Sequence, residues 1–385
     1  MSQHMRFTVS CPTRIEFGAG ASTALVAHLP RGTRTVAVMT GASGTVAEPI
    51  LRDLRQSGVE VVHIRCGTEP SVDSISAVLA ELVGRRPDVV VACGGGSVID
   101  TGKLVAFLLS HNLELDDDFD RLDQALLSVP ARIICIAVPT TAGTGAEVTA
   151  NSVISVPSKG AKVSVRGRAL HPGVALVDPS LMSGAPAQVI LRSGLDAVTQ
   201  VIESYTSNAA TPFSDALCLP SIGKGLSALA GVVDTGDAKS WEDLAWVSLS
   251  SGIALANSGL GAAHGLAAVI GGQYHAPHGA LCGRLLIPVL RRNIERAEQG
   301  SDADKKLVEC AALIGDRFQS QEGGDQLSGF EAWMDAQNLP RLSDWGVAAD
   351  ALDALALEGM AASSSKKNAV VLTHQDFIRI LEESL

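Results

Sequence analysis

The sequence predicts an α/β domain with a parallel sheet, followed by a domain built of helices alone. In the first half, apolar segments of strand length alternate with segments of helical periodicity, an order typical of a parallel sheet with helices on both faces. Two glycine-rich turns follow apolar strands there, and beyond residue 182 nearly every apolar segment has helical spacing. A chain of 385 residues can bury two cores, so we place the domains at residues 1–182 and 183–385.

The elements follow from hydrophobic periodicity. Short apolar runs predict the strands, which cover residues 35–41, 59–66, 87–94 and 132–139. Helical spacing predicts helices over residues 46–58, 71–86, 188–207, 212–233, 240–258 and 303–319. The prolines and the Asp-Pro pair around residues 181–187 mark the boundary. We expect loops at residues 116–123, which are acidic, and at residues 362–368.

Composition excludes several classes of function. The net charge of −11 argues against a nucleic-acid partner and against an anionic membrane, since both need clustered Lys and Arg. The seven cysteines form no C-x-x-C pair, so no zinc knuckle or dithiol site is indicated, and reduced thiols are expected. The N-terminus lacks a signal-peptide core, and no apolar run reaches the length of a membrane span. We therefore expect a soluble, cytoplasmic protein.

Two loops resemble phosphate-binding turns. The stretch "GGGSVIDTGK" places Gly94, Gly95 and Gly96 after a predicted strand, with a helix opening at Ser97. Glycines let the backbone approach a pyrophosphate, and the helix start presents free N–H groups. The stretch "PTTAGTGAE" follows another strand with similar glycines. Two such loops at the carboxyl ends of parallel strands would face one nucleotide-binding crevice, whereas a plain strand-to-helix turn would explain the first loop equally well on its own.

A metal site is suggested in the helical half. In "GLDAVTQVIES", Asp196 and Gln200 are four residues apart and so share a helix face. We place His264 in mid-helix, and His278 at the opening of a new segment after Pro277. Two oxygens and two nitrogens suit Fe²⁺ or Zn²⁺ with one position left for substrate. The simpler alternative is that each histidine is a satisfied core residue.

These motifs, in this order and over nearly the whole chain, resemble the iron-containing (group III) alcohol dehydrogenase family. The resemblance implies a Rossmann-like N-terminal domain, a helical C-terminal domain as in dehydroquinate synthase, and a nicotinamide cofactor, NAD or NADP, in the cleft. It implies a divalent metal, usually iron and sometimes zinc, at Asp196, Gln200, His264 and His278. The reaction would be hydride transfer with a small or medium alcohol or aldehyde, and a homodimer is expected. The cofactor would be lined by Asp100, Thr140, Thr141, Thr144 and Lys162.

The sequence departs from the family at three places. Histidine is usual where Gln200 stands, and an amide oxygen is a weaker donor than imidazole, so lower metal affinity is implied. A further histidine is frequent where Ala268 stands; His275 is a candidate to replace it as the catalytic proton relay, although a surface position for His275 is as open. In "MTGASG", Gly41 replaces the aspartate of NAD-preferring relatives, and Ser43 could bind a 2′-phosphate, so NAD and NADP both stay open.

Two other activities of the same fold are alternatives. A metal-independent, maleylacetate reductase-like enzyme fits Gln200 and Ala268, but fits Asp196, His264 and His278 poorly. A lyase related to dehydroquinate synthase would need a basic pocket, whereas "GLGAAHGLAAVIGG" is small and apolar.

Overall fold

The computed structural model describes residues 6–67, 69–115, 122, 126, 132–156, 161–320 and 322–385. It forms two compact units. One is Pro12–Pro186, and the other is Ala187–Leu385 together with the described residues up to Cys11. The chain start joins the helical unit through Asn257, whose Oδ1 accepts from Ser10 N at 2.7 Å and whose Nδ2 donates to Ser10 O at 3.0 Å. The division thus falls at residues 186 and 187, where the sequence suggests 182 and 183.

The α/β unit is built on one six-stranded sheet, in which all pairs are parallel. The strand order is β1-β8-β5-β4-β2-β3. The prediction of a parallel sheet is confirmed. The strands are β1 (Arg14–Phe17), β2 (Thr35–Thr40), β3 (Glu60–Arg65), β4 (Val89–Gly94), β5 (Ile134–Pro139) and β8 (Val174–Val177).

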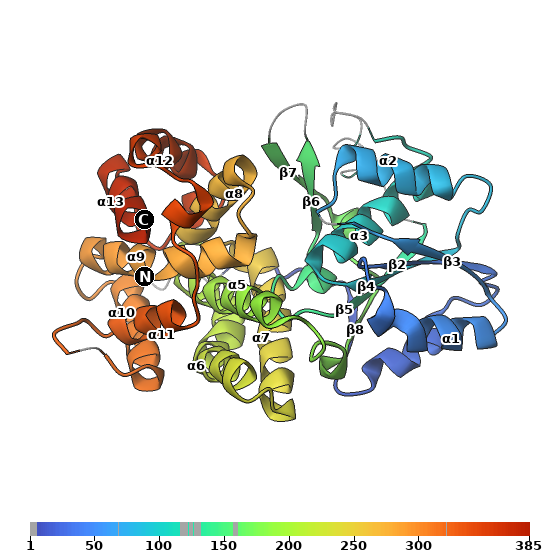
Figure 1. Cartoon of the computed structure of the whole chain (residues 1–385), viewed down its shortest axis with the longest axis horizontal. Coiled ribbons are helices and arrows are strands. Elements are labelled where there is room, and N and C mark those ends of the chain that lie inside the picture. The colour runs from blue at the N-terminus through green and yellow to red at the C-terminus, as the bar shows by residue number, and fades with distance from the viewer. Residues whose placement is uncertain are drawn as a thin grey trace. The chain divides into compact units, whose positions relative to one another are not determined.

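Both faces of this sheet are covered by helices (Figure 1). In β2, Ala37 and Met39 pack into the core under α2 (Val72–Glu81) and α3 (Gly96–His111). Val36 and Val38 point to the other face, toward the 3₁₀ helix η1 (Ala21–His28) and α1 (Glu48–Gln56). Because successive strand residues alternate between faces, a strand buried on both sides must be apolar throughout, which explains the unbroken apolar runs.

An antiparallel hairpin, which the sequence analysis does not predict, lies beside the sheet. It consists of β6 (Asn151–Val156) and β7 (Ala161–Arg166). Its strands are short and half-polar, so their pattern is weak in the sequence. Asp100 Oδ2 accepts from Val153 N at 2.9 Å and Pro70 O accepts from Ser155 N at 2.8 Å, which ties the hairpin to the α/β unit.

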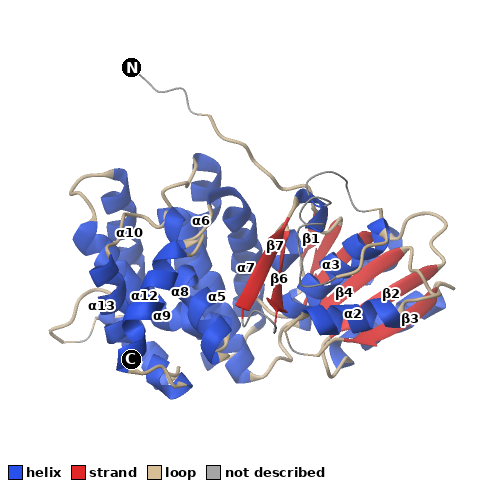
Figure 2. Cartoon of the chain, turned by 90° about the horizontal axis from the view of Figure 1, so that it is seen from above, coloured by secondary structure: helices blue, strands red, loops and turns tan. Residues whose placement is uncertain are grey.

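The second unit contains only helices in its described part (Figure 2). The long helix α5 (Ala187–Thr206) is its centre and contacts α6, α7, α8, α9 and α10. From Gly194 to Thr206 every residue of α5 is buried. The other helices are α6 (Pro212–Asp234), α7 (Ala238–Ser258), α8 (Ala262–Tyr274), α9 (His278–Arg296), α10 (Asp302–Arg317), α11 (Ser328–Ala336), α12 (Leu352–Ala361) and α13 (His374–Ser384).

The helix α6 is long and apolar enough to cross a membrane by length and composition, although no unbroken apolar run marks it in the sequence. Half of its apolar window is buried, and it packs against α5 and α7, as a core helix does. The predicted acidic loop at residues 116–123 lies outside the described residues apart from Leu122. Residues 362–368 form the predicted connection, with a 3₁₀ turn, η9 (Ser365–Lys367), inside it.

Candidate metal centre and cofactor loops

One face of α5 carries three buried polar side chains. Asp196, Gln200 and Glu203 are each less than 5% exposed, and spacings of three, four and seven residues align them along the helix. Gln200 Nε2 donates to Ser251 Oγ of α7 at 2.6 Å. Asp196 and Gln200 share one face of α5, as predicted, and Glu203 extends this polar face by one turn.

Glu203, which the sequence analysis missed, orients His264. Its Oε1 accepts from Ala263 N at 2.7 Å, and its Oε2 lies 2.6 Å from His264 Nδ1. The carboxylate therefore binds free N–H groups at the start of α8, where negative charge is stabilising. His264 is the third residue of α8, so its predicted mid-helix position is wrong. Since a carboxylate accepts, Nδ1 carries the proton, and Nε2 presents a lone pair whenever the ring is neutral.

That lone pair faces another acceptor. His264 Nε2 lies 3.3 Å from Asp196 Oδ1, and both side chains are at most 5% exposed. Neither atom makes a hydrogen bond within the described structure. Two buried acceptors at this distance repel each other unless a proton or a cation stands between them. The pair therefore fits a bound metal ion, and the hydrogen bond of Nδ1 to Glu203 is the kind of outer contact that metal-binding histidines make.

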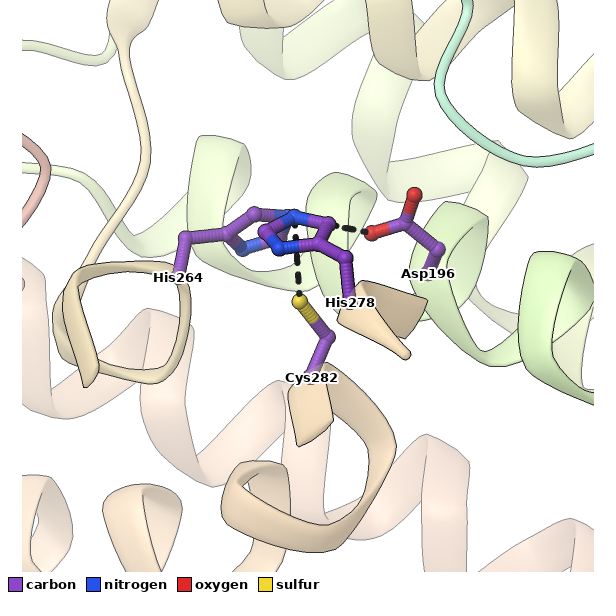
Figure 3. A group of neighbouring side chains, drawn as sticks. All are labelled: Asp196, His264, His278 and Cys282. Carbon is purple, nitrogen blue, oxygen red and sulfur yellow. Dashed lines mark hydrogen bonds and ion pairs between the residues drawn. The ribbon is translucent and has the colours of Figure 1, made fainter. Parts of the chain in front are cut away.

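His278 and Cys282 complete the group (Figure 3). His278 is the first residue of α9, as predicted, and its Nε2 lies 3.8 Å from Asp196 Oδ1. Cys282, one turn later, places Sγ 3.5 Å from that nitrogen. One ligand atom from each of Asp196, His264, His278 and Cys282 lies within 4.8 Å of all the others. The i, i+4 spacing of His278 and Cys282 was the sequence signal that could have revealed the thiol.

The electrostatics of the group favour positive charge at its centre. Burial alone would lower the pKa of His264, but Cys282, Asp196 and Glu203 outweigh it and raise the pKa well above its ordinary value. Burial opposes ionisation of Asp196 as well, yet His264 and His278 hold the pKa of that carboxyl below its ordinary value. The His278 side chain is 40% exposed, whereas those of Asp196 and His264 are at most 5% exposed. Solvent therefore reaches the group beside His278.

His275 lies outside this group. It ends α8 in the left-handed conformation, with φ of 53°, and it is exposed. Its proposed role as a proton relay stays a prediction.

The two glycine loops lie side by side in the α/β unit. β4 and β5 are neighbours, and Thr140 N donates to Gly94 O at 2.9 Å. A Cβ on Gly96 would stand 2.8 Å from Thr144 Oγ1, and one on Gly95 would stand 3.3 Å from Thr141 Oγ1. The helix α3 begins at Gly96, one residue before the predicted Ser97. The two loops therefore lie against each other. A side chain at position 96 would collide with Thr144, so this close approach depends on glycine there.

Two further predicted cofactor residues have protein partners. Asp100 Oδ1 pairs with Lys103 Nζ at 2.8 Å, while its other oxygen holds the hairpin. Lys162 of β7 pairs with Glu69 at 2.6 Å. Their contacts with a cofactor stay predictions. To make them, each side chain would have to bind the cofactor in addition to the protein partner that it already contacts.

Glu147, in the second glycine loop, leads to a prediction about pH. It is 2% exposed, and burial raises the pKa of its carboxyl from 4.5 to about 7, against the backbone and Lys103. Since the folded state holds this proton more tightly, the free energy of unfolding should fall as pH rises from about 4.5 to about 7. We expect Glu147→Gln to raise the free energy of unfolding at pH 8 by about 2–3 kcal/mol, and with it Tm. At pH 4 both should change little. Thermal denaturation at both pH values measures this; an equal shift at both would contradict it.

Comparison with known proteins identifies the chain. The family described as iron-containing alcohol dehydrogenase matches residues 12–179, and its C-terminal counterpart, described as Fe-containing alcohol dehydrogenase family, C-terminal, matches residues 190–385. The chain belongs to the iron-containing alcohol dehydrogenase family. It is accordingly a metal-dependent, NAD(P)-linked alcohol dehydrogenase that acts on small alcohols or aldehydes.

Individual relatives agree with this family. Alcohol dehydrogenase 4 of Saccharomyces cerevisiae is 32% identical over 348 residues, which are 89% of this chain and 87% of that protein. The iron-containing alcohol dehydrogenase from Thermococcus thioreducens superposes with a TM-score of 0.85 at 26% identity, covering 98% of this chain and 99% of the other. A crystal structure of 1,3-propanediol oxidoreductase gives a TM-score of 0.83 at 26% identity, over 99% and 100%.

Proposed function

We propose that Asp196, His264 and His278 hold the catalytic divalent metal of this iron-type alcohol dehydrogenase. The observation that supports this most is the buried contact of 3.3 Å between Asp196 Oδ1 and His264 Nε2, two atoms that make no hydrogen bond among the described residues. Their donor set, one carboxylate and two imidazoles, binds Fe²⁺ or Zn²⁺ well. The predicted fourth ligand, Gln200, lies on the same helix face and remains a proposal.

The residues around this centre orient the reaction. When bound, the metal acts as a Lewis acid on the substrate oxygen, and the nicotinamide carries the hydride. Glu203 fixes the His264 ring with Nε2 turned inward, and Asp196 supplies negative charge beside it. The alcohol or aldehyde would approach from the side of His278, whose side chain is 40% exposed. Ala268, one turn after His264 and exposed, adds no proton donor, so proton exchange there would be with water.

The cofactor would lie on the glycine loops. Free N–H groups at the start of α3, beside Gly94, Gly95 and Gly96, suit a pyrophosphate. The hydroxyls of Thr140, Thr141 and Thr144 stand on the neighbouring loop. Asp100 and Lys162 would contribute only alongside their present contacts with Lys103 and Glu69. This placement would use the carboxyl ends of β4 and β5, where open α/β sheets bind nucleotides.

The end of β2 favours NADP over NAD. Gly41 and Ser43 follow β2 without a carboxylate, and a Cβ on Gly44 would stand 3.4 Å from His63 Cε1 and 3.6 Å from Arg65 Nε. Burial, Arg65 and Arg55 lower the pKa of His63, while Glu48 opposes them. A positively charged surrounding of this kind, with an exposed arginine, suits a 2′-phosphate.

We therefore expect kcat/KM to be at least about 10-fold higher with NADPH than with NADH. The Arg65→Ala substitution should lower kcat/KM for NADPH by about 10-fold, since a hydrogen bond between charged groups contributes about 1.5–3 kcal/mol, and should leave NADH unchanged. Arg52→Ala, on the exposed face of α1, is the control. Equal use of both cofactors by the unaltered enzyme would contradict the preference.

The test of the main proposal is removal and return of metal. Aldehyde-dependent oxidation of NADPH and NADH is measured on the purified protein, after a chelator, and after addition of Fe²⁺ or Zn²⁺. We expect activity to fall at least about 100-fold and to return with metal, because the Lewis acid contributes several kcal/mol. Activity that ignores the chelator would instead indicate the metal-independent, maleylacetate reductase-like alternative.

We also propose a cytoplasmic enzyme that binds neither nucleic acid nor membranes, which the net charge of −11 supports. A homodimer is proposed from the family alone, and its mass in solution tests it.

A further inference from the structure

We infer that Cys282 is a thiolate ligand of the metal, in the place that the sequence assigns to Gln200. The inference rests on the proposed metal centre. It would make the centre an Asp-His-His-Cys site, whose sulfur favours zinc over iron. The observations that support it are the distances within the group, the unsatisfied atoms that face it, and the hydrogen bonding of Gln200.

The distances agree with a shared tetrahedral ion. Two ligands of one tetrahedral zinc lie about 3.3 Å apart when both are nitrogen or oxygen, and about 3.6 Å apart when one is sulfur, given bonds of about 2.0–2.1 Å and 2.3 Å. His264 Nε2 and Asp196 Oδ1 are 3.3 Å apart, and Cys282 Sγ and His278 Nε2 are 3.5 Å apart. The contact of 3.8 Å between His278 and Asp196 is slightly longer. The thiol therefore already stands where a fourth ligand would.

The thiol of Cys282 is buried beside polar atoms that a metal ion would satisfy. Cys282 is fully buried and lies in a core cluster that includes residues of α8 and α13, yet its Sγ is directed to the polar group, 3.5 Å from His278 Nε2. The group contains two polar atoms, Asp196 Oδ1 and His264 Nε2, whose side chains are at least nine-tenths buried and which lack a hydrogen bond. A thiol that merely filled space would not need such neighbours.

Gln200 is placed to support the site in another way. Its Nε2 donates to Ser251 Oγ at 2.6 Å, and Ser251 Oγ in turn donates to Ser248 O at 2.7 Å. This chain holds the amide against α7. A neutral amide oxygen is also a weaker donor to zinc than a thiolate. Binding through Cys282 releases the thiol proton to solvent, and the added negative charge lowers the net charge of the centre by one relative to ligation by Gln200.

The test is cobalt substitution followed by optical spectroscopy. The metal-free protein is loaded with one equivalent of Co²⁺, and absorption is recorded in the visible, where ligand-field bands report binding, and in the near ultraviolet, where sulfur-to-cobalt charge transfer appears. We expect both in the unaltered protein. Cys282→Ser, nearly the same size, should lose the charge-transfer band and bind Zn²⁺ at least about 10-fold more weakly.

Two further variants make the result specific. Cys310→Ala removes another buried thiol of the helical unit, in α10, and should retain the band. Gln200→Ala should retain it too. Cobalt that binds without a charge-transfer band, in the unaltered protein, overturns the role of Cys282 whether or not the variants fold, and leaves the metal centre standing. A band that survives in Cys282→Ser overturns it equally. Failure to bind cobalt at all overturns the metal centre itself.

Discussion

Replacing Asp196 with asparagine should remove both the metal and the activity. Asparagine keeps the size of the side chain but loses the negative charge that lies 3.3 Å from His264 Nε2 and 3.8 Å from His278 Nε2. We expect no stoichiometric metal after purification and a fall in kcat of at least about 10³-fold, equivalent to several kcal/mol of lost Lewis-acid stabilisation. Metal analysis and steady-state kinetics on the same preparation measure both.

The fold of this variant should survive. An amide N–H at position 196 can donate to His264 Nε2, an atom that makes no hydrogen bond within the described residues. Thr199→Val is a matched control on the same helix, since Thr199 is fully buried and its hydroxyl has no hydrogen-bond partner in the part of the chain that the structure describes. It should keep metal and activity. A metal-free but fully active Asp196→Asn enzyme would show that these ligands are not catalytic.

Replacing Gly279 with alanine should cause a large loss of stability. Gly279 follows the ligand His278 at the start of α9, and a Cβ there would stand 2.2 Å from Arg192 O and 3.1 Å from Asp196 Cβ, both in α5. The first of these is backbone, which cannot rotate away, so α9 would have to move from α5. We expect a loss of about 3 kcal/mol or more, or about 6–12 °C in Tm, together with weaker metal binding because His278 moves as well.

Gly223→Ala is the matched control for this substitution. Gly223 also lies within a helix, α6, but a Cβ there meets only Leu313 Cδ2 at 3.6 Å, an ordinary contact. Because glycine is less favourable than alanine inside a helix by about 0.5–1 kcal/mol, this variant should be as stable as the original or more so. Thermal denaturation compares the two. Similar Tm values for both variants would mean that α5 and α9 are not packed as closely as described.

Most of the α/β unit could be predicted because its signals are local. The runs around Val36 and Val89 are continuous and apolar since each strand is buried on both faces. The hairpin of β6 and β7 was missed because each strand has only six residues and mixes polar with apolar side chains, so its apolar signal is weak. The joining of Ser10 to Asn257 connects residues 247 apart in sequence, and no local pattern carries such a contact.

The sequence alone is enough to predict most of the order of elements, the two glycine loops, and three of the side chains at the proposed metal centre. Asp196 lies on a helix face with regular spacing, and His278 follows a proline that starts a helix; both are properties of neighbouring residues. The contact of Glu203 with His264 and the approach of Cys282 to the same group become apparent only once the helices are packed together. These contacts join α5 to α8 and α9. Which residues of separate helices meet depends on how closely the helices pack, and Gly279 allows α9 to approach α5 closely. No single segment of the sequence encodes that distance.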